Sequence, residues 1–405
     1  MKILNIANVA GTKRGGGVHE VVYNFWRIQN SLGYSSDLWF PGYKEEELEL
    51  IKESDFDKVR ALDTYFHPSK SFLKNFKRLL SQMSEYNIIH QHGIWVPISK
   101  LTLEANKNHK GIVIIQPHGY LEPYRLNISK LKKQLAYYVF EKTNLERARL
   151  LIACSNEEYL NLKIMFPSKD IAIIPNGVSE DFYLANSKND YFNRDKYLGR
   201  KNMLFLSRIH PLKGLVRFLK VYASIDKETR ENWNIIIAGI DQDNHSQELN
   251  KIVKDLKISD FVYFEGEKFK DEKVNIMSSA DLFILPTFNE NYGIVVAESL
   301  SRGVPVLTTK GAPWSLLEKE NCGFWVDNNQ EGIKMGLEKA MLFPEDKLKL
   351  MGENGRRIAK NYFLWDGIVH KTIELYSWLI NGGEKPDFVY EGNKSSKNQS
   401  IFNDK

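Results

Sequence analysis

The sequence predicts an α/β protein made of two domains, each built around a parallel sheet. Short β-rich runs alternate with longer helical stretches along nearly all of the 405 residues, which is the pattern of successive strand–helix–strand units. The length favours two domains, because a single hydrophobic core stops growing at about 250–300 residues. Several of the β-rich runs are almost continuously apolar, as expected for strands that are covered on both faces.

Six segments in each half of the chain are predicted as strands. They are residues 2–9, 35–40, 86–93, 111–119, 150–155 and 170–177 in the first half, and 202–209, 233–240, 261–266, 281–287, 304–309 and 323–327 in the second. Turn formers at 175–177 end the sixth strand, and a polar stretch follows at 186–202. We therefore expect a first domain at 1–177, a second at 178–364, a late helix at 365–383 and a disordered polar tail at 384–405.

The composition argues against several classes of protein. Hydrophobic residues make up 42% and charged residues 26% of the chain, which is an ordinary globular balance. The only cysteines, Cys154 and Cys322, are too few for a disulfide framework and fit a reducing cytoplasm. No apolar run approaches the ~20 residues that span a bilayer, and the N-terminus lacks the features of a signal peptide. These observations indicate a cytoplasmic protein.

Positive charge is concentrated in one segment. The net charge is +5, yet residues 100–149 hold ten Lys and Arg against four acids. Such a patch can attract anionic lipid or a phosphate-bearing acceptor, and the alternative is an ordinary solvated helix face. The first interpretation predicts a peripheral contact with the inner face of the cytoplasmic membrane. Nucleic acid is not an expected partner, because the basic residues lack an interleaved aromatic platform.

The strongest candidate site follows the predicted strand 281–287. Asn291, Tyr292 and Gly293 are typical of a loop that opens a helix, whose N-terminus offers backbone N–H groups and a partial positive charge. That arrangement suits a diphosphate or a sugar hydroxyl. Glu290 precedes the helix and Glu298 lies one or two turns into it, where they could accept hydrogen bonds from a sugar and from a ribose diol. A helix-dipole partner and a surface glutamate are the structural alternative.

A second candidate element follows the predicted strand 202–209. Arg208 and Lys213 lie five positions apart on what should be a strand-to-helix loop. Two cations there could hold a diphosphate, the arginine as a fork and the lysine as a point charge. They would also stabilise the negative charge that develops on a departing nucleoside diphosphate. A pair of exposed cations without a ligand is the alternative.

The first domain contributes weaker signals. The run Gly15, Gly16 and Gly17 after the first strand permits close backbone approach to a phosphate or sugar, although it matches neither a Walker A loop nor a dinucleotide fingerprint. His118 stands at the end of the predicted strand 111–119, where it could hydrogen-bond a sugar. A flexible loop and a structural histidine are the alternatives.

Further polar and aromatic residues of the first domain are assigned to an acceptor. The segment IIHQHGIW contains His90 and His92, but no third or fourth ligand stands out, so no metal is expected. We instead predict that His92 and Trp95 of this segment, together with Tyr120, line the acceptor side.

Five motifs together resemble one family, the family-four retaining glycosyltransferases, also called glycosyltransferase group 1. The resemblance covers essentially the whole chain except the tail, and its matching motifs are Gly15–Gly17, His118, Pro175–Val178, Arg208 with Lys213, and Glu290 with Glu298. Residues 308–327 further resemble a subgroup of this family that is common in bacterial surface-polysaccharide clusters. Val18–Val21 depart from the acidic-then-basic order of many relatives, which leaves the N-terminal contacts open.

The resemblance implies a GT-B fold, with two Rossmann-like domains that face each other across a cleft. It implies that no metal or cofactor is needed, and that a nucleotide-diphosphate sugar is the co-substrate, a UDP-sugar before a GDP-sugar. Glu290 would orient the donor sugar, Glu298 would hold the ribose, and His118 would contact the sugar near the reacting carbon. The remaining donor residues would be Gly16, Gly17, Arg208, Lys213, Asn291, Tyr292 and Gly293.

The implied activity is retaining transfer of a hexose or N-acetylhexosamine to a glycan or lipid-linked acceptor in lipopolysaccharide, O-antigen or capsule synthesis. Two other functions stay open at this point. One is a sugar-nucleotide epimerase or a phosphorylase-like enzyme on a related fold, and the other is a non-catalytic sugar-nucleotide-binding subunit.

Overall fold

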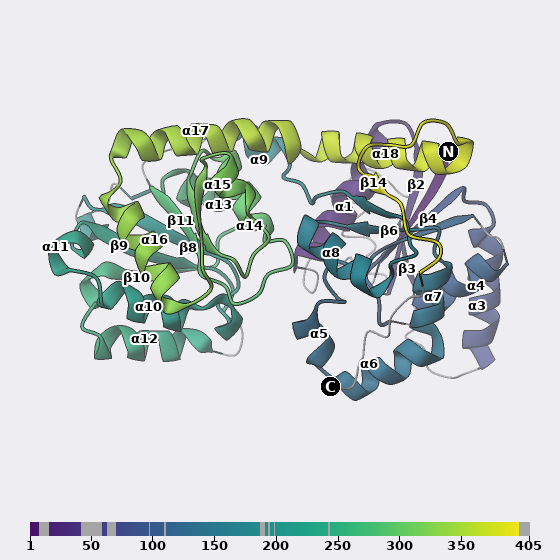
Figure 1. Ribbon diagram of the computed structural model, residues 1–405, viewed down its shortest axis with the longest axis horizontal. Helices are drawn as coiled ribbons and strands as arrows, with labels where there is room; N and C mark the ends of the chain where they lie inside the picture. Colours follow the sequence, from purple (N-terminus) through teal and green to yellow (C-terminus); the bar gives the residue numbers. More distant parts are fainter. Residues whose placement is uncertain are drawn as a thin grey trace. The chain divides into compact units, whose positions relative to one another are not determined.

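The computed structural model describes residues 1–7, 16–41, 59–62, 70–96, 98–108, 111–186, 191–192, 195–197, 199–241 and 244–396. The chain divides into two compact α/β units (Figure 1). The first unit comprises Met1–Asn176 and Trp365–Lys405, and the second comprises Gly177–Leu364. Each unit is built around its own largely parallel sheet, so the predicted fold class is confirmed.

The sheet of the first unit has the order β14-β7-β6-β5-β4-β1-β2-β3. Its strands are β1 (Lys2–Ala7), β2 (Ser35–Pro41), β3 (Val59–Leu62), β4 (Ile88–His92), β5 (Ile112–Gln116), β6 (Leu150–Ala153), β7 (Ile171–Ile173) and β14 (Val389–Tyr390). All neighbouring strands run parallel except β14, which pairs antiparallel to β7. β1 lies between β2 and β4, so the strand order reverses beside the first strand.

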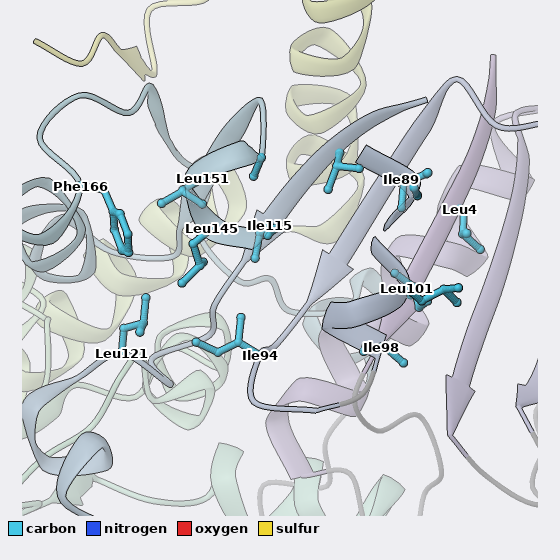
Figure 2. Packing of buried hydrophobic residues seen from close by; sticks show 14 of the residues in the cluster. Leu4, Ile89, Ile94, Ile98, Leu101, Ile115, Leu121, Leu145, Leu151 and Phe166 are labelled. Carbon is cyan, nitrogen blue, oxygen red and sulfur yellow. The ribbon is translucent and has the colours of Figure 1, made fainter. Parts of the chain in front are cut away.

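The helices of this unit cover an apolar sheet. They are α1 (Gly16–Ser31), α3 (Lys70–Met83), α4 (Ile98–Lys107), α5 (Pro123–Asn127), α6 (Lys130–Ala136), the π-helical turn η1 (Tyr137–Glu141), α7 (Lys142–Arg147), α8 (Asn156–Met165) and α18 (Trp365–Asn381). Figure 2 shows buried side chains of the sheet, such as Leu4, Ile89 and Ile115, packed with Leu101 and Leu145 from helices. Burial of these side chains is the main stabilising contribution in this unit.

The sheet of the second unit has the order β10-β9-β8-β11-β12-β13 and is entirely parallel. Its strands are β8 (Lys201–Leu206), β9 (Trp233–Ala238), β10 (Val262–Gly266), β11 (Leu282–Leu285), β12 (Val306–Thr309) and β13 (Gly323–Val326). Its α-helices are α9 (Glu180–Leu184), α10 (Leu215–Ala223), α11 (Lys227–Arg230), α12 (His245–Asp255), α13 (Lys270–Ser278), α14 (Ile294–Ser301), α15 (Leu316–Lys319), α16 (Gln330–Leu342) and α17 (Glu345–Tyr362). Short 3-10 turns lie at η2 (Asp195–Tyr197), η3 (Pro211–Lys213) and η4 (Ser259–Phe261).

The structure corrects two expectations. A strand that the sequence did not predict, β3, pairs with β2 at the edge of the first sheet. The tail was expected to be disordered, yet Val389 and Tyr390 pair with Ala172 and Ile171 of β7. The ring of Tyr390 lies 4.9 Å from that of Tyr159, and Lys394 Nζ donates to Asp170 Oδ1 at 2.5 Å. Residues 397–405 lie outside the described ranges.

Two backbone segments of the second unit approach each other too closely for side chains. A Cβ atom on Gly352 of α17 would lie 1.9 Å from the carbonyl oxygen of Gly303, just after α14. Real Cβ atoms do not come this close to backbone, so α14 and α17 can pack as they do only because position 352 is glycine. Gly367 of α18 offers a contrast, because nothing lies within 4 Å of a Cβ placed there.

We predict that Gly352→Ala lowers the free energy of unfolding by about 1–3 kcal/mol, since the methyl group forces α14 and α17 apart. Gly367→Ala, the matched control, should raise it by about 0.4–1 kcal/mol, because alanine restricts the unfolded chain and favours the helix. Urea unfolding of the two variants measures both effects. Equal stabilities would contradict the close approach of the helices.

Candidate active site

The candidate site of the second unit forms where its strand order reverses. β8 and β11 are neighbours in the sheet although β9 and β10 lie between them in sequence. Open parallel sheets bind ligands beyond the carboxyl ends of their strands at such a reversal. The residues predicted to bind a diphosphate and a sugar follow β8 and β11, so the topology brings the two loops together.

Backbone contacts fix these two loops to each other. The amide of Phe288 donates to the carbonyl oxygen of Leu212 at 2.9 Å, and Thr287 Oγ1 donates to the same oxygen at 3.1 Å. Gly214 has a φ of 74°, and a Cβ there would lie 2.0 Å from the carbonyl oxygen of Pro286. Glycine is therefore required at position 214 for both its backbone conformation and its close approach.

Lys213 and Glu290 form an ion pair across the two loops. The Lys213 ammonium donates to Glu290 Oε2, and the two side chains are only 9% and 19% exposed. Removing either partner would leave the other charge poorly solvated, so each depends on the other in this structure. An ammonium group has three N–H donors, and Lys213 therefore keeps capacity for the oxygens of an anion.

Arg208 stands two residues beyond β8 on the same loop, and its side chain is exposed. The sequence predicted that Arg208, Lys213 and Glu290 act together. The structure brings Lys213 and Glu290 into direct contact and places Arg208 on the loop that carries Lys213.

The N-terminus of α14 adds backbone donors beside this pair. Gly293 is the N-cap residue with a φ of 79°, and a Cβ there would lie 3.1 Å from Glu290 Cγ. The Tyr292 carbonyl accepts a hydrogen bond from Trp314 Nε1, and the Glu290 amide donates to the Gly311 carbonyl at 2.7 Å. Asn291 is half-buried in the same loop. The loop is thus held by its backbone, which preorganises the helix start.

Glu298 lies further along α14 and is nearly buried. Its Oε1 accepts from Lys273 Nζ of α13 at 2.5 Å, whereas its buried Oε2 has no hydrogen-bond partner in the described part of the chain. An unsatisfied buried carboxylate oxygen is costly, and it is suited to accept a hydroxyl donor. The sequence did not single out Lys273, because a lysine on an amphipathic helix carries no motif.

The glycine run of the first unit falls partly outside the described residues. Residues 8–15, including Gly15, belong to no described range, whereas Gly16 and Gly17 open α1 directly. The sequence predicted a loop at all three glycines. Gly16 and Gly17 are instead the first residues of a helix, at the edge where β1 lies beside β4.

Three histidines stack at the carboxyl ends of β4 and β5. The ring centroids of His90 and His92 lie 3.9 Å apart, and those of His92 and His118 lie 5.4 Å apart at an angle of 18°. His92 Nδ1 and His118 Nε2 share a hydrogen bond of 3.2 Å, and His92 Nε2 lies 3.3 Å from Asn5 Oδ1. His90 Nδ1 is 2.7 Å from the Tyr376 hydroxyl.

This arrangement corrects the role predicted for His92. The side chain is fully buried inside β4, and both ring nitrogens are occupied, so it cannot contact an acceptor. Strand residues of a sheet covered on both faces point into the interior, and the sequence-based assignment overlooked this. His92 instead supports the ring of His118, which keeps 5% of its surface exposed.

Burial keeps all three imidazoles neutral. It lowers the pKa of His90 and that of His118 to about 3, and it lowers the pKa of His92 well below 6.5. Neighbouring imidazoles act in the same direction on His90 and His92, because two positive charges this close repel each other. His118 is therefore a neutral hydrogen-bonding group at physiological pH, not a cation.

The loops after β4 and β5 are held by buried polar groups. Trp95 Nε1 donates to the Tyr120 carbonyl at 3.0 Å, which ties together the two loops predicted to face an acceptor. Glu141 Oε2 accepts from the Trp95 amide at 2.9 Å, and its other oxygen accepts from Asn144 Nδ2 at 3.0 Å. Burial raises the pKa of Glu141.

Glu158 holds the backbone beside His118 in place, and the sequence analysis did not identify it. Its buried carboxylate accepts from the Gly119 amide at 2.6 Å and from the Cys154 amide at 2.7 Å. The first bond fixes the residue directly after His118, which has a left-handed φ of 55°. The available signal was the spacing of Ser155 and Glu158, since a Ser followed three residues later by Glu marks a helix start.

We predict that Glu158→Gln lowers the free energy of unfolding by about 1–3 kcal/mol, because the new amide turns an N–H₂ group toward one of two buried backbone donors. Chemical denaturation measures this loss. Glu157→Gln at the half-buried neighbouring position should leave stability nearly unchanged, and equal losses in both variants would argue against the two amide contacts.

The buried imidazoles predict an acid-sensitive fold. Their pKa values in the folded state lie below the unfolded value near 6.5, so the unfolded chain binds more protons once the pH falls below 6.5. The stability is therefore fully present above that pH and falls by about 1.4 kcal/mol per pH unit for each imidazole as the pH approaches 3. His90→Gln should reduce this slope by about 1.4 kcal/mol per pH unit, which corresponds to one proton. Denaturation at several pH values measures the slope. The exposed His370→Gln should not, and an unchanged slope in His90→Gln would refute the assignment.

Comparison with known proteins agrees with this geometry. Residues 15–182 match the family model for Glycosyltransferase Family 4, and residues 186–358 match that for glycosyl transferases group 1. Sucrose-phosphate synthase from Thermosynechococcus elongatus has a TM-score of 0.75 at 17% identity and covers 95% of this chain and 100% of that chain. HepE from Anabaena, solved with UDP and glucose, has a TM-score of 0.72 at 16% identity and covers 93% and 99%. These similarities show the GT-B fold.

Curated relatives are 22–24% identical to this chain, and the first two are matched over less than two thirds of their own length. An uncharacterized glycosyltransferase of Methanocaldococcus jannaschii is 22% identical over 62% of this chain, which spans 65% of that relative. A GDP-mannose:cellobiosyl-diphosphopolyprenol alpha-mannosyltransferase of Xanthomonas campestris is 24% identical over 57% of this chain and 58% of its own length. The O-antigen biosynthesis glycosyltransferase WclY of Escherichia coli is 24% identical over 76% of this chain and 80% of its own.

Within the described ranges, no group of three His, Cys, Asp or Glu side chains is arranged to hold a metal ion. The two family models together match most of the chain, one in each half. The first half of the chain therefore carries a Glycosyltransferase Family 4 domain, and the second half carries a glycosyl transferases group 1 domain.

Proposed function

We propose that this chain is a retaining, metal-independent glycosyltransferase that moves a hexose or N-acetylhexosamine from a nucleotide-diphosphate sugar to a glycan or lipid-linked acceptor. The observation that carries the proposal is the Lys213–Glu290 pair beside the N-terminus of α14 at the reversal of strand order. A cation, a hydrogen-bond acceptor and the backbone N–H groups of a helix start are what a sugar diphosphate requires.

In the reaction that we propose, the bond between the anomeric carbon and the diphosphate oxygen breaks while the acceptor oxygen bonds to the same face of that carbon. The acceptor proton passes to the departing diphosphate, so the protein need not supply a nucleophile. Arg208 and Lys213 stabilise the charge on the leaving group. Glu290 orients the donor sugar, Glu298 holds the ribose, and neutral His118 hydrogen-bonds the transferred sugar.

A UDP-sugar is the first donor to test, because the similar HepE structure holds UDP and glucose. GDP-mannose is the second, because the Xanthomonas relative is named for it. The relative named for O-antigen biosynthesis supports a role in bacterial surface polysaccharide. In the described part of the chain no helix is long and apolar enough to cross a membrane, and the basic segment 100–149 fits peripheral contact with an anionic membrane.

The first test is binding of the purified chain to UDP, GDP and their sugars by thermal shift. A ligand at 100 times its Kd raises stability by about 2.7 kcal/mol, so the correct nucleotide should raise the Tm clearly. Lys213→Ala should abolish the shift, whereas Lys349→Ala, which removes an exposed cation of the same unit, should preserve it. No shift with any nucleotide would overturn the proposal.

The second test follows release of the nucleoside diphosphate with polyprenyl-diphosphate-linked sugars as acceptors. We expect release only when donor and acceptor are both present, and a loss of about 10²–10³ in kcat in Lys213→Ala and Glu290→Ala. Circular dichroism checks that the variants stay folded. Sugar interconversion without an acceptor would indicate an epimerase, and full activity in both variants would exclude this site.

A further inference from the structure

One helical segment of the first unit exposes apolar side chains to an unusual degree. Leu131 is 81% exposed, Leu135 is 68% exposed, and Tyr138 and Val139 are each 61% exposed. Leu131 and Leu135 stand four positions apart on α6 and share one face, and Tyr138 and Val139 follow in the π-helical turn η1. α6 has no buried residue, and Tyr124 and Ile128 extend the exposed apolar surface to its start.

The charged side chains that this segment presents at the surface are all positive. Residues 123–142 hold five cations, Arg125, Lys130, Lys132, Lys133 and Lys142. The single acid in this range, Glu141, is fully buried, and its carboxylate accepts hydrogen bonds from the Trp95 amide and Asn144. The exposed Lys130 and Lys132 stand on either side of Leu131 in the sequence, whereas the only acid of this range points into the protein.

Some cations of the basic segment 100–149 form ion pairs in the structure, so they add little net charge to its surface. Lys107 pairs with Glu104, and Arg149 pairs with Asp170, so these outlying cations are compensated by carboxylates. Four cations and the exposed apolar residues lie on the stretch from α5 to η1, and Figure 1 shows α5 and α6 at the lower edge of the first unit.

We propose that this apolar–basic face, formed by Tyr124, Ile128, Leu131, Leu135, Tyr138 and Val139 with the flanking cations, docks into the surface of an anionic lipid bilayer. A helix of this kind lies in the interface with its apolar face among the acyl chains and its cations at the headgroups. Each Lys or Arg near an anionic surface strengthens the binding. Contiguous exposed apolar patches mark interaction sites.

Charge selects lipid over a second copy of the chain as the occupant. A two-fold interface through this face would bring its cations against the same cations of the partner, and like charges at an interface are unfavourable. An anionic bilayer accepts both the apolar side chains and the cations. This proposal deepens the proposed function, on which it rests for the membrane location of a lipid-linked acceptor, but binding to lipid requires no donor.

The test is co-sedimentation of the full chain with vesicles of phosphatidylcholine alone and of phosphatidylcholine with phosphatidylglycerol. The wild-type chain should bind the anionic vesicles, and the double variant Leu131→Gln with Leu135→Gln should bind about tenfold less or weaker still. Glutamine keeps the helix propensity, and circular dichroism checks the fold. The double variant Met335→Gln with Leu342→Gln removes two apolar residues of α16 that are 63% and 70% exposed and should bind like wild type.

Equal binding of the wild-type chain to both vesicle types, or unchanged binding of the Leu131/Leu135 variant, would overturn the proposal. Sedimentation velocity without lipid tests whether a second copy of the chain occupies this face. A dimer that the wild-type chain forms and the Leu131/Leu135 variant does not form would assign this face to the second copy. Nucleotide binding by thermal shift is measured on the same samples, so a failure of lipid binding is distinct from a failure of the proposed function.

Discussion

The reversal of strand order within each sheet is the constraint on which the candidate site depends. In both units the earliest strand lies in the interior of the sheet, and the chain later returns to its other side, as β4 beside β1 and as β11 beside β8. The loops that leave neighbouring strands then diverge, and the backbone at their carboxyl ends stays accessible. Lys213 and Glu290, far apart in sequence, meet for this reason alone.

Charge compensation is the second organising feature of the second unit. Two lysines each neutralise a glutamate of the donor motif, Lys213 at Glu290 and Lys273 at Glu298. For the donor that we propose, phosphate oxygens and ribose hydroxyls would have to compete for the same four groups. The site is thus close to neutral by itself, and in the reaction that we propose Arg208 would contribute the additional positive charge that a diphosphate needs.

The sequence pattern predicted most strands of both sheets, because a parallel strand that is buried on both faces appears in the sequence as an apolar run between turn formers. β3 and β14 were not predicted, because they are short edge strands. Their pairing depends on a distant partner and leaves little local periodicity in the sequence. Lys213 and Glu290 were chosen because they follow predicted strands, and the structure brings these two side chains into contact. His92 was misassigned because both faces of β4 are covered. Glu158 was missed because its partners, the amides of Gly119 and Cys154, are fixed only by the tertiary fold.

The antiparallel pairing of β14 with β7 has a consequence for biosynthesis. The first unit needs residues from both ends of the chain, since α18 and β14 are made only after the whole second unit. Until then the growing polypeptide displays β7 as an unpaired sheet edge, and such edges promote association between chains. The chain must therefore emerge from the ribosome as far as Tyr390 before the sheet of this unit is complete, so the first unit finishes folding only after the second unit has been made.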